Sequence, residues 1–165
     1  MAKCRPEPVV PFSWAAYDAA NMKQSILAAR EVPNAFIEYV GDGSDGKIHQ
    51  EEAHREWQDA ITDNEKTVIL GPVGSGKSSQ VRLRLIWEIG NDPENVRIAY
   101  ISQSEDHPKK QAASIREMIE RNPRIAHVFP HLRRSVKLWA AKAFSVDRES
   151  MLPDPTFQVY GLYGK

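Results

Sequence analysis

The chain of 165 residues has a single cysteine, Cys4, and no long apolar stretch. One thiol cannot form an internal disulfide, which is typical of proteins in a reducing compartment. No apolar run approaches the roughly 20 residues that a membrane-spanning helix needs, and the N-terminus lacks the apolar core of a signal peptide. The histidines have no metal-ligand spacing with a cysteine, so we assign no Cys/His metal site. These absences predict a cytosolic protein.

Net charge is also lacking, because 22 Lys and Arg balance 22 Asp and Glu. The charges are nevertheless unevenly placed along the chain. Residues 1–106 carry 11 basic against 17 acidic side chains, whereas residues 107–148 carry 10 against 3. Such a basic segment favours a polyanionic partner beyond the nucleotide discussed next, and a solvated helix face is the alternative explanation.

What the chain does have is the sequence GPVGSGKS at residues 71–78, which we call the phosphate loop. It fits the pattern G-x-x-x-x-G-K-[ST], in which glycines let backbone N–H groups turn toward a phosphate. Lys77 would reach the β- and γ-phosphates, and the Ser78 hydroxyl would ligate Mg²⁺. Two fixed glycines alone occur by chance at roughly one start position in 200. The motif therefore predicts binding of a nucleoside triphosphate; the alternative is a glycine-rich turn with an exposed lysine.

The residues around the phosphate loop predict a strand before it and a helix after it. Residues 67–70 (Thr-Val-Ile-Leu) are β-branched and apolar and indicate a buried strand. Residues 79–89 have apolar side chains on two sides, which indicates a helix buried between layers, with Gly90 at its C-cap. A second strand is expected at residues 96–101. Because a helix separates the two strands, they should be parallel.

The rest of the chain carries weaker signals for helices, strands and a domain division. Residues 1–12 are rich in proline and should form an extended arm. Helices are expected at residues 14–30, 50–61 and 108–122, the first ended by Pro33, and short strands at residues 143–146 and 156–160. The buried face of the second of these helices should hold Ala53, Trp57, Ala60 and Ile61. We expect an N-terminal arm, helix and loop at residues 1–48 and a P-loop core at residues 49–165.

Hydrolysis of a nucleotide would need an acidic residue at the end of a second buried strand to hold Mg²⁺. The strand at residues 96–101 is followed by Ser102, Gln103 and Ser104, and Glu105 and Asp106 come too far along. Asp147 follows residues 144–146, whose alternating pattern suits a half-exposed strand. Neither position provides a convincing catalytic acid.

Several stretches in order resemble the N-terminal ATPase domain of a phage terminase large subunit, the motor that packages double-stranded DNA into proheads. The resemblance covers roughly residues 33–164, and apart from the phosphate loop it is carried by the order and spacing of short pieces. Those pieces are His54-Arg55-Glu56-Trp57-Gln58, Val68-Ile69-Leu70-Gly71-Pro72, Arg97-Ile98-Ala99-Tyr100-Ile101-Ser102, Ile119-Glu120-Arg121-Asn122-Pro123, Val128-Phe129-Pro130, Phe144-Ser145-Val146-Asp147-Arg148, Pro155-Thr156-Phe157 and Gly161.

The resemblance implies an α/β fold of the P-loop NTPase class, RecA-like and of the additional-strand type, with a central mostly parallel sheet flanked by helices. In that family the acidic second motif follows the point where this chain ends, so the core is expected to be incomplete at its C-terminus and to hydrolyse ATP slowly or not at all. The resemblance implies a C-terminal nuclease domain as well, which is expected to follow these 165 residues. The resemblance also implies ATP and Mg²⁺ as cofactors. Its implied partners are double-stranded DNA, the portal, the small terminase subunit and further copies in a ring, in the host cytoplasm at the assembling prohead and away from any membrane.

The expected site residues follow from the motif and the resemblance together. Gln58 resembles the adenine-reading glutamine of helicase and terminase motors; its alternative is a polar residue on an amphipathic helix. Lys77 and Arg148 are the catalytic candidates, Arg148 as an arginine finger acting on a neighbouring subunit or else as a surface arginine. The nucleotide-binding set is Gln58, Gly71, Pro72, Val73, Gly74, Ser75, Gly76, Lys77, Ser78 and Ser79, with Ser78 on Mg²⁺. Candidates for DNA phosphate contacts are Lys109, Lys110, Arg133, Arg134 and Lys137, or these five are simply solvated.

Two further functions stay open at the level of sequence. One is another P-loop enzyme, either a helicase-like ATPase or a small phage kinase. A kinase would have an arginine-rich lid segment, and Arg133-Arg134 is the only weak indication of one. The other is a nucleotide-binding module without turnover, which the missing catalytic acid favours. Unlike many terminases, the loop has Pro72-Val73 and no arginine, so any arginine finger must come from elsewhere in the chain or from a neighbour.

Overall fold

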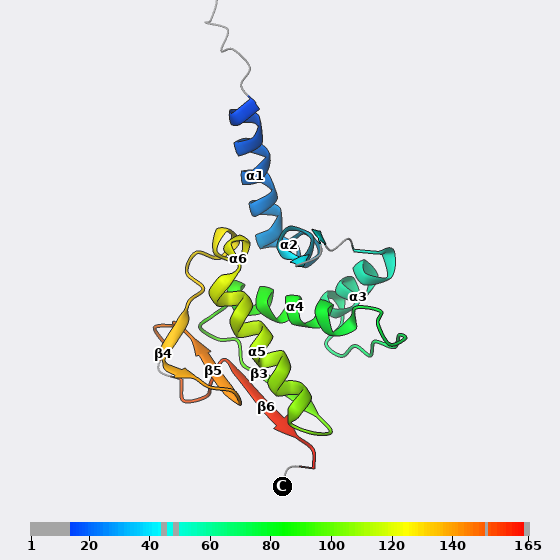
Figure 1. Cartoon of the computed structure of the whole chain (residues 1–165), viewed down its shortest axis with the longest axis vertical. Helices are drawn as coiled ribbons and strands as arrows, with labels where there is room; N and C mark the ends of the chain where they lie inside the picture. Colours follow the sequence, from blue (N-terminus) through cyan, green and yellow to red (C-terminus); the bar gives the residue numbers. More distant parts are fainter. Residues whose placement is uncertain (1–13, 44–45, 48–49, 151, 164–165) are drawn as a thin grey trace, which may run out of the picture.

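The computed structural model describes residues 14–43, 46–47, 50–150 and 152–163. It is a mixed α/β protein with a four-stranded mixed sheet flanked by helices (Figure 1). The helices are α1 (Trp14–Glu31), α2 (Pro33–Val40), α3 (Glu52–Asp63), α4 (Lys77–Asn91), α5 (Asp106–Arg121) and α6 (Pro123–Val128). The strands are β1 (Asp42–Gly43), β2 (Gly46–Lys47), β3 (Ile98–Ser102), β4 (Arg134–Trp139), β5 (Ala143–Val146) and β6 (Phe157–Gly161). The arm predicted at residues 1–12 lies outside the described residues.

The four-stranded sheet has the order β3-β6-β5-β4. Strands β3 and β6 are parallel, with Ile98 opposite Phe157 and Ser102 opposite Gly161. Strand β5 runs antiparallel to both β6 and β4. The prediction of a mostly parallel sheet is therefore wrong for the described residues. The β4-β5-β6 half is built from strands that follow one another in the chain, and such strands pair antiparallel through connections too short for a crossover helix.

The strand predicted at residues 67–70 does not form in the described sheet. The segment has no ladder partner there, and the side chains of Val68 and Leu70 are 85% and 86% exposed. Its contact is with α3, since Thr67 Oγ1 donates a hydrogen bond to the carbonyl of Ala60 (3.0 Å). High β-propensity produces a strand only where neighbouring strands offer a pleated surface. The expectation of two parallel strands on either side of the phosphate loop is therefore wrong as well.

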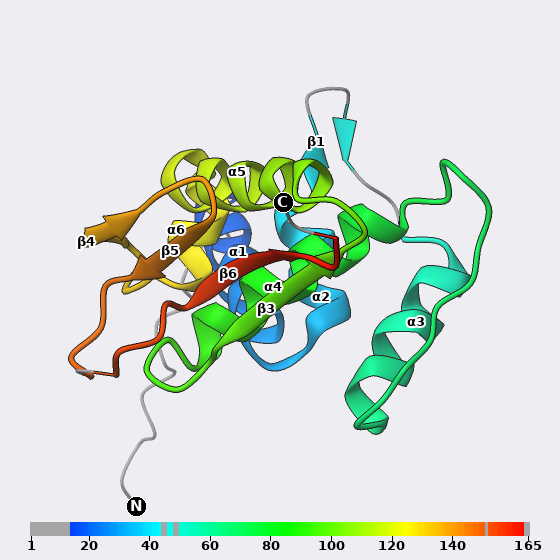
Figure 2. The same cartoon turned by 90° about the horizontal axis from the view of Figure 1, so that it is seen from below.

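Helix α4 runs through the middle of the molecule, with α5 beside it (Figure 1). Its residues Leu83, Ile86 and Ile89 are buried, while Leu85 and Trp87 are half-buried against the same core. Apolar contacts on more than one side confirm the prediction of a helix between layers. Seen from below, β3 and β6 lie on the opposite side of α4 from the N-terminal helices (Figure 2).

The sheet contributes an aromatic cluster to this core. The rings of Phe144 on β5 and Phe157 on β6 stack with centroids 5.0 Å apart, and Trp139 on β4 meets Phe144 edge-on at 4.9 Å. Phe144, Ser145 and Val146 are all buried, so the expectation of a half-exposed strand at residues 144–146 is wrong. Both faces of β5 are covered at this point, which an alternating pattern containing a small serine does not reveal.

Helices α1 and α2 pack onto the same hydrophobic core as α4 and α6. Ala29, Phe36 and Ile37 are fully buried in it. The indole Nε1 of Trp87 donates to the carbonyl of Ala29 (3.1 Å), which ties α4 to α1. Pro33 opens α2 as well as ending α1, because its missing N–H costs nothing in the first helical turn. The domain boundary predicted at residue 48 stays a prediction. None of the described helices is long and apolar enough to cross a membrane.

Several elements were missed and one helix face was misplaced by sequence reasoning. Helices α2 and α6 and strands β1, β2 and β4 were not expected. In α3 the buried residue is Gln58, while Ala53 is exposed and Trp57 is half-buried, so the predicted apolar face is wrong. The buried side of α3 is polar because it meets polar groups of α4, as described below.

Gly90 lies inside helix α4 and does not form its C-cap, which is Asp92. The glycine is buried, and a Cβ built at this position would overlap the ring of Phe129, whose Cγ would lie 2.6 Å away. The space is needed by the aromatic ring that connects α6 to the core. The absence of a side chain is thus a packing requirement and not a requirement of backbone conformation.

Substituting Gly90→Ala is expected to destabilise the protein, although alanine is the better helix former. Overpacking against Phe129 should lower the free energy of unfolding by about 1–3 kcal/mol, whereas an uncrowded Gly→Ala change in a helix would raise it by roughly 0.5–1 kcal/mol. Urea unfolding measures the sign directly. The double variant with Phe129→Leu should recover part of the loss, and a Gly90→Ala protein more stable than the parent would contradict the close packing.

Candidate nucleotide-binding site

The phosphate loop connects α3 to α4 and has the backbone that its glycines allow. Gly74 and Gly76 have φ angles of +84° and +77°, in the left-handed region that glycine enters without strain. Helix α4 begins directly after Gly76, at Lys77. An open cavity of about 430 Å³ is lined by residues 73–79 of this loop and helix. A curled glycine backbone in front of a helix N-terminus is a general anion-binding arrangement.

Lys77 is folded over the loop. Its Nζ lies 2.6 Å from the carbonyl oxygens of Gly71 and Pro72 and 3.2 Å from Ser75 Oγ. An ammonium group needs acceptors, and here the loop supplies them from its own first residues. A phosphate would offer charged acceptors to the same group. Lys77 is therefore placed to exchange carbonyl oxygens for phosphate oxygens.

The start of α4 leaves N–H groups available for a ligand. The first intrahelical bond is donated by Gln80 to the carbonyl of Gly76 (2.9 Å), so the preceding helical N–H groups have no partner within the helix. Ser78, in this first turn, is exposed. Its hydroxyl is the hard oxygen donor that Mg²⁺ accepts alongside waters and substrate phosphates. No group of three or more His, Cys, Asp or Glu among the described residues could hold a metal ion.

Gln58 lies in a buried amide network between α3 and α4. The side chain is fully buried, and its Nε2 donates to Oε1 and to the backbone carbonyl of Gln80 (3.1 and 3.3 Å). Gln50 Nε2 also donates to Gln80 Oε1 (3.0 Å), while Gln58 Oε1 has no hydrogen-bond partner. In this conformation the amide of Gln58 holds the phosphate-loop helix. Reading of adenine by Gln58 stays a prediction, and it requires the side chain to leave this network.

Helix α3 also contacts the loop through His54 and Trp57, which sequence reasoning did not place in the site. His54 Nε2 lies 2.9 Å from the carbonyl oxygen of Ser75. Trp57 lies under the start of the loop, where a Cβ on Gly71 would be 3.5 Å from its Cζ2. The spacing of His54, Trp57 and Gln58 could have predicted this contact, because residues three and four apart lie on the same side of a helix. The same spacing would have placed the side chains of His54 and Trp57 on the face that holds Gln58.

Arg148 lies away from the phosphate loop within this chain. Its Nη2 donates to the carbonyls of Leu152 and Asp154 (2.9 and 2.6 Å), which closes the connection between β5 and β6. Burial and the nearby positive charge of Arg97 lower the pKa of Arg148. In both views β4 and β5 lie at the opposite side of the molecule from α3 (Figure 1, Figure 2). A role of Arg148 as a finger would therefore concern a neighbouring copy.

The five basic residues predicted to contact DNA are spread along α5 and in or directly before β4. Lys109, near the start of α5, pairs with Glu105 (2.9 Å), whereas Arg134 pairs with Glu120 near the end of the same helix (3.4 Å). At 1.5 Å of rise per residue these two ends of α5 are separated by about 16 Å. Lys110, Arg133 and Lys137 are exposed. Lys137 does share a cavity of about 370 Å³ with Arg148.

Of the candidate acids after the strands, Glu105 has its carboxylate in ion pairs. Glu105 accepts from Lys142 and Lys109 (2.6 and 2.9 Å), and these bonds lower the pKa of its carboxyl group. The backbone N–H of Asp147 donates to the carbonyl of Arg133 (2.7 Å), which places Asp147 at the end of the β4–β5 ladder. The structure thus assigns Glu105 to linking α5 to the β4–β5 turn.

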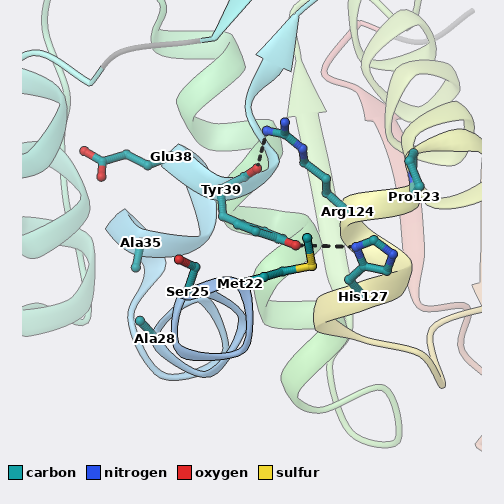
Figure 3. Close-up of a pocket in the computed structure, with 9 residues that line it drawn as sticks. All are labelled: Met22, Ser25, Ala28, Ala35, Glu38, Tyr39, Pro123, Arg124 and His127. Carbon is teal, nitrogen blue, oxygen red and sulfur yellow. Dashed lines mark hydrogen bonds between the residues drawn. The ribbon is translucent and has the colours of Figure 1, made fainter. Parts of the chain in front are cut away.

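A second cavity, of about 560 Å³, lies between α1, α2 and α6 and contains none of the predicted site residues (Figure 3). Tyr39 crosses it, with its hydroxyl 3.4 Å from Nδ1 of His127 and its backbone carbonyl accepting from Arg124 Nη1 (2.9 Å). The sulfur of Met22 points toward the same hydroxyl. The two hydrogen bonds link α2 to α6.

Comparisons of the chain with protein families, with curated proteins and with solved structures return no match.

Replacement of Lys77 tests the loop as a nucleotide site. Lys77→Ala should weaken binding of ATP with Mg²⁺ by well over tenfold, because charge-assisted contacts to phosphate are about twice as strong as neutral ones. Isothermal calorimetry measures the affinity. Lys66→Ala, which removes an exposed lysine from the segment before the loop, is the matched control. Equal affinity of the Lys77→Ala and parent proteins would reject the assignment of the loop.

Proposed function

We propose that the chain binds a nucleoside triphosphate, ATP by preference, together with Mg²⁺ at the phosphate loop. The observation that carries the proposal is the arrangement at residues 71–78. Two glycines with positive φ and the first turn of α4, including Lys77, all border one open cavity. Backbone donors and one cation around a concave surface are the groups that a triphosphate requires.

The residues of this chain would divide the task as follows. Lys77 would move from the carbonyls of Gly71 and Pro72 onto the terminal phosphates, and the first N–H groups of α4 would donate to the β-phosphate. Ser78 would supply one oxygen to Mg²⁺. When bound, the ion neutralises charge that develops on the phosphates. Gln58 would read adenine after leaving Gln80.

We further propose that this site is the ATP-binding part of a viral DNA-packaging motor, a P-loop NTPase of the RecA-like class. The support is the order of short stretches around the loop that resembles the terminase large subunit. Exposed Lys110, Arg133 and Lys137 are the side chains offered to DNA phosphates. In such a motor ATP hydrolysis drives movement of double-stranded DNA, and subunits in a ring supply arginine fingers to one another. Portal and small-subunit contacts belong to the same proposal.

A nucleotide-binding module without turnover is the second candidate, and the engagement of Glu105 favours it. That carboxylate is paired with Lys109 and Lys142, so it would have to leave both lysines to ligate Mg²⁺. A helicase-like ATPase or a small phage kinase would use the same loop, but Arg134 of the suggested kinase lid is paired with Glu120. This pairing gives the kinase no support.

A phosphate-release assay separates hydrolysis from binding alone. We expect the chain to bind ATP and to release phosphate at a rate close to that of its Lys77→Ala variant, because an acid on the Mg²⁺ shell is needed for fast turnover. The Lys77→Ala protein corrects for contaminating ATPases. Brisk turnover that is lost in this variant would contradict the expectation and would exclude the non-hydrolysing module.

Binding of double-stranded DNA tests the motor proposal. The chain should bind DNA weakly and without sequence preference, with log affinity falling linearly as log salt rises. Joint replacement Lys110→Glu and Arg133→Glu should reduce the slope by about 0.9 for each DNA phosphate that the variant no longer neutralises. Fluorescence anisotropy at several salt concentrations measures it, with the double variant Lys23→Glu and Lys66→Glu, both exposed lysines, as the charge-matched control. An unchanged slope would show that Lys110 and Arg133 are solvated residues.

A further inference from the structure

His54 forms two hydrogen bonds that together fix the position of its ring proton. The backbone N–H of Glu51 lies 3.2 Å from Nδ1, and the carbonyl oxygen of Ser75 lies 2.9 Å from Nε2. A backbone N–H can only donate, so Nδ1 is the acceptor. The proton of the neutral ring is then on Nε2, which donates to Ser75. One tautomer thus joins the start of α3 to the phosphate loop.

The bond to Ser75 also fixes the direction of the next N–H group. The carbonyl of Ser75 and the N–H of Gly76 belong to one peptide, and the described residues contain no cis peptide bond. In a trans peptide the two groups point in opposite directions. With the carbonyl held toward α3, the Gly76 N–H points away from α3. The cavity at this place is lined by residues 73–79 alone, so the N–H is turned to the side where a phosphate would lie.

The imidazole is held closely enough to act as a rigid support. It meets Trp57 edge-on with ring centroids 5.1 Å apart. On its other side the loop backbone approaches it directly, since a Cβ on Gly76 would lie 3.3 Å from Nε2. Rigidity matters here because residues 67–70, before the loop, have no strand partner among the described residues. The loop is therefore supported from α3.

We infer that His54 is a positioning residue of the phosphate loop, which turns the Ser75–Gly76 peptide so that its N–H is presented to the phosphates of the bound nucleotide. The inference rests on the proposed nucleotide site. It adds to that site a residue outside the motif, which orients the loop backbone before the nucleotide binds. Preorganisation of this kind raises affinity because the loop is already ordered when the nucleotide binds.

Two substitutions separate the two hydrogen bonds of His54. In His54→Gln the side-chain amide reaches the place of Nε2, so it can donate to Ser75 but no longer accepts from Glu51. In His54→Asn the shorter side chain reaches the place of Nδ1, so it can accept from Glu51 but no longer reaches Ser75. The pair therefore tests the contact with the loop separately from the contact within α3.

Loop order in the ligand-free chain is the first measurement. NMR order parameters of the Gly74 and Gly76 amides should be close to the rigid-backbone value of about 0.85 in the parent and in His54→Gln, and should fall toward about 0.6 in His54→Asn. The second is calorimetry with ATP and Mg²⁺. His54→Asn should bind roughly two- to tenfold more weakly, the range expected for removal of one hydrogen bond, and His54→Gln should recover most of the affinity.

His127→Asn is the matched control, since His127 bonds Tyr39 in the second cavity and does not contact the phosphate loop. The inference is overturned if His54→Asn keeps both the parent's order parameters and its affinity. It is also overturned if His54→Gln loses as much affinity as His54→Asn, because the ring would then act only by its bulk against Trp57. If the parent itself fails to bind ATP, the proposed function is rejected, and the order parameters still decide whether His54 orders the loop.

Discussion

The structure depends on how helix α4 is held at its two ends. Its middle and C-terminal part is fixed by the core, where Leu83, Ile86 and Ile89 are buried and Gly90 admits the ring of Phe129. Its N-terminal end carries the phosphate loop and lacks a preceding sheet strand among the described residues. Apolar burial there is small, so the geometry of the loop relies on directional hydrogen bonds from α3. One helix thus contributes both to the stability of the fold, through apolar burial, and to the geometry of the loop, through hydrogen bonds.

The interface between α3 and α4 is polar, which has consequences for its behaviour. Gln50, Gln58 and Gln80 are buried and share hydrogen bonds, and Arg84 Nη1 reaches Thr62 Oγ1 on α3 at 2.8 Å. Buried amides specify one register between the helices, since any slip leaves several groups unpaired. Gln58 Oε1 already lacks a partner, so part of this cost is present in the described conformation. An interface of this kind is specific yet only modestly stable, which would suit the proposed binding of a nucleotide at the start of α4.

Sequence patterns predicted those elements whose signals are local. Helix α5 and strand β5 follow from their apolar spacing and bounding residues, and the loop follows from its motif. The strand at residues 67–70 could not be judged locally, because Val68 and Leu70 need a neighbouring strand that sequence does not supply. Gly90 was misjudged for a similar reason, since its partner Phe129 is distant in sequence. Strand β4 contains exposed Val136 and charged residues, so its apolar alternation is weak, and only pairing with β5 defines it.

Lys77 differs from the other proposed functional side chains in what a nucleotide would require of it. Its present acceptors, the carbonyls of Gly71 and Pro72, belong to the loop itself, so exchange for phosphate oxygens needs only a side-chain movement. Arg148 would have to release the carbonyls of Leu152 and Asp154, which would open the connection between β5 and β6. Gln58 would have to leave a buried network. In the proposed site, binding of phosphate would therefore come first on energetic grounds, and reading of the base or action on a neighbouring subunit would draw on the energy that this binding provides.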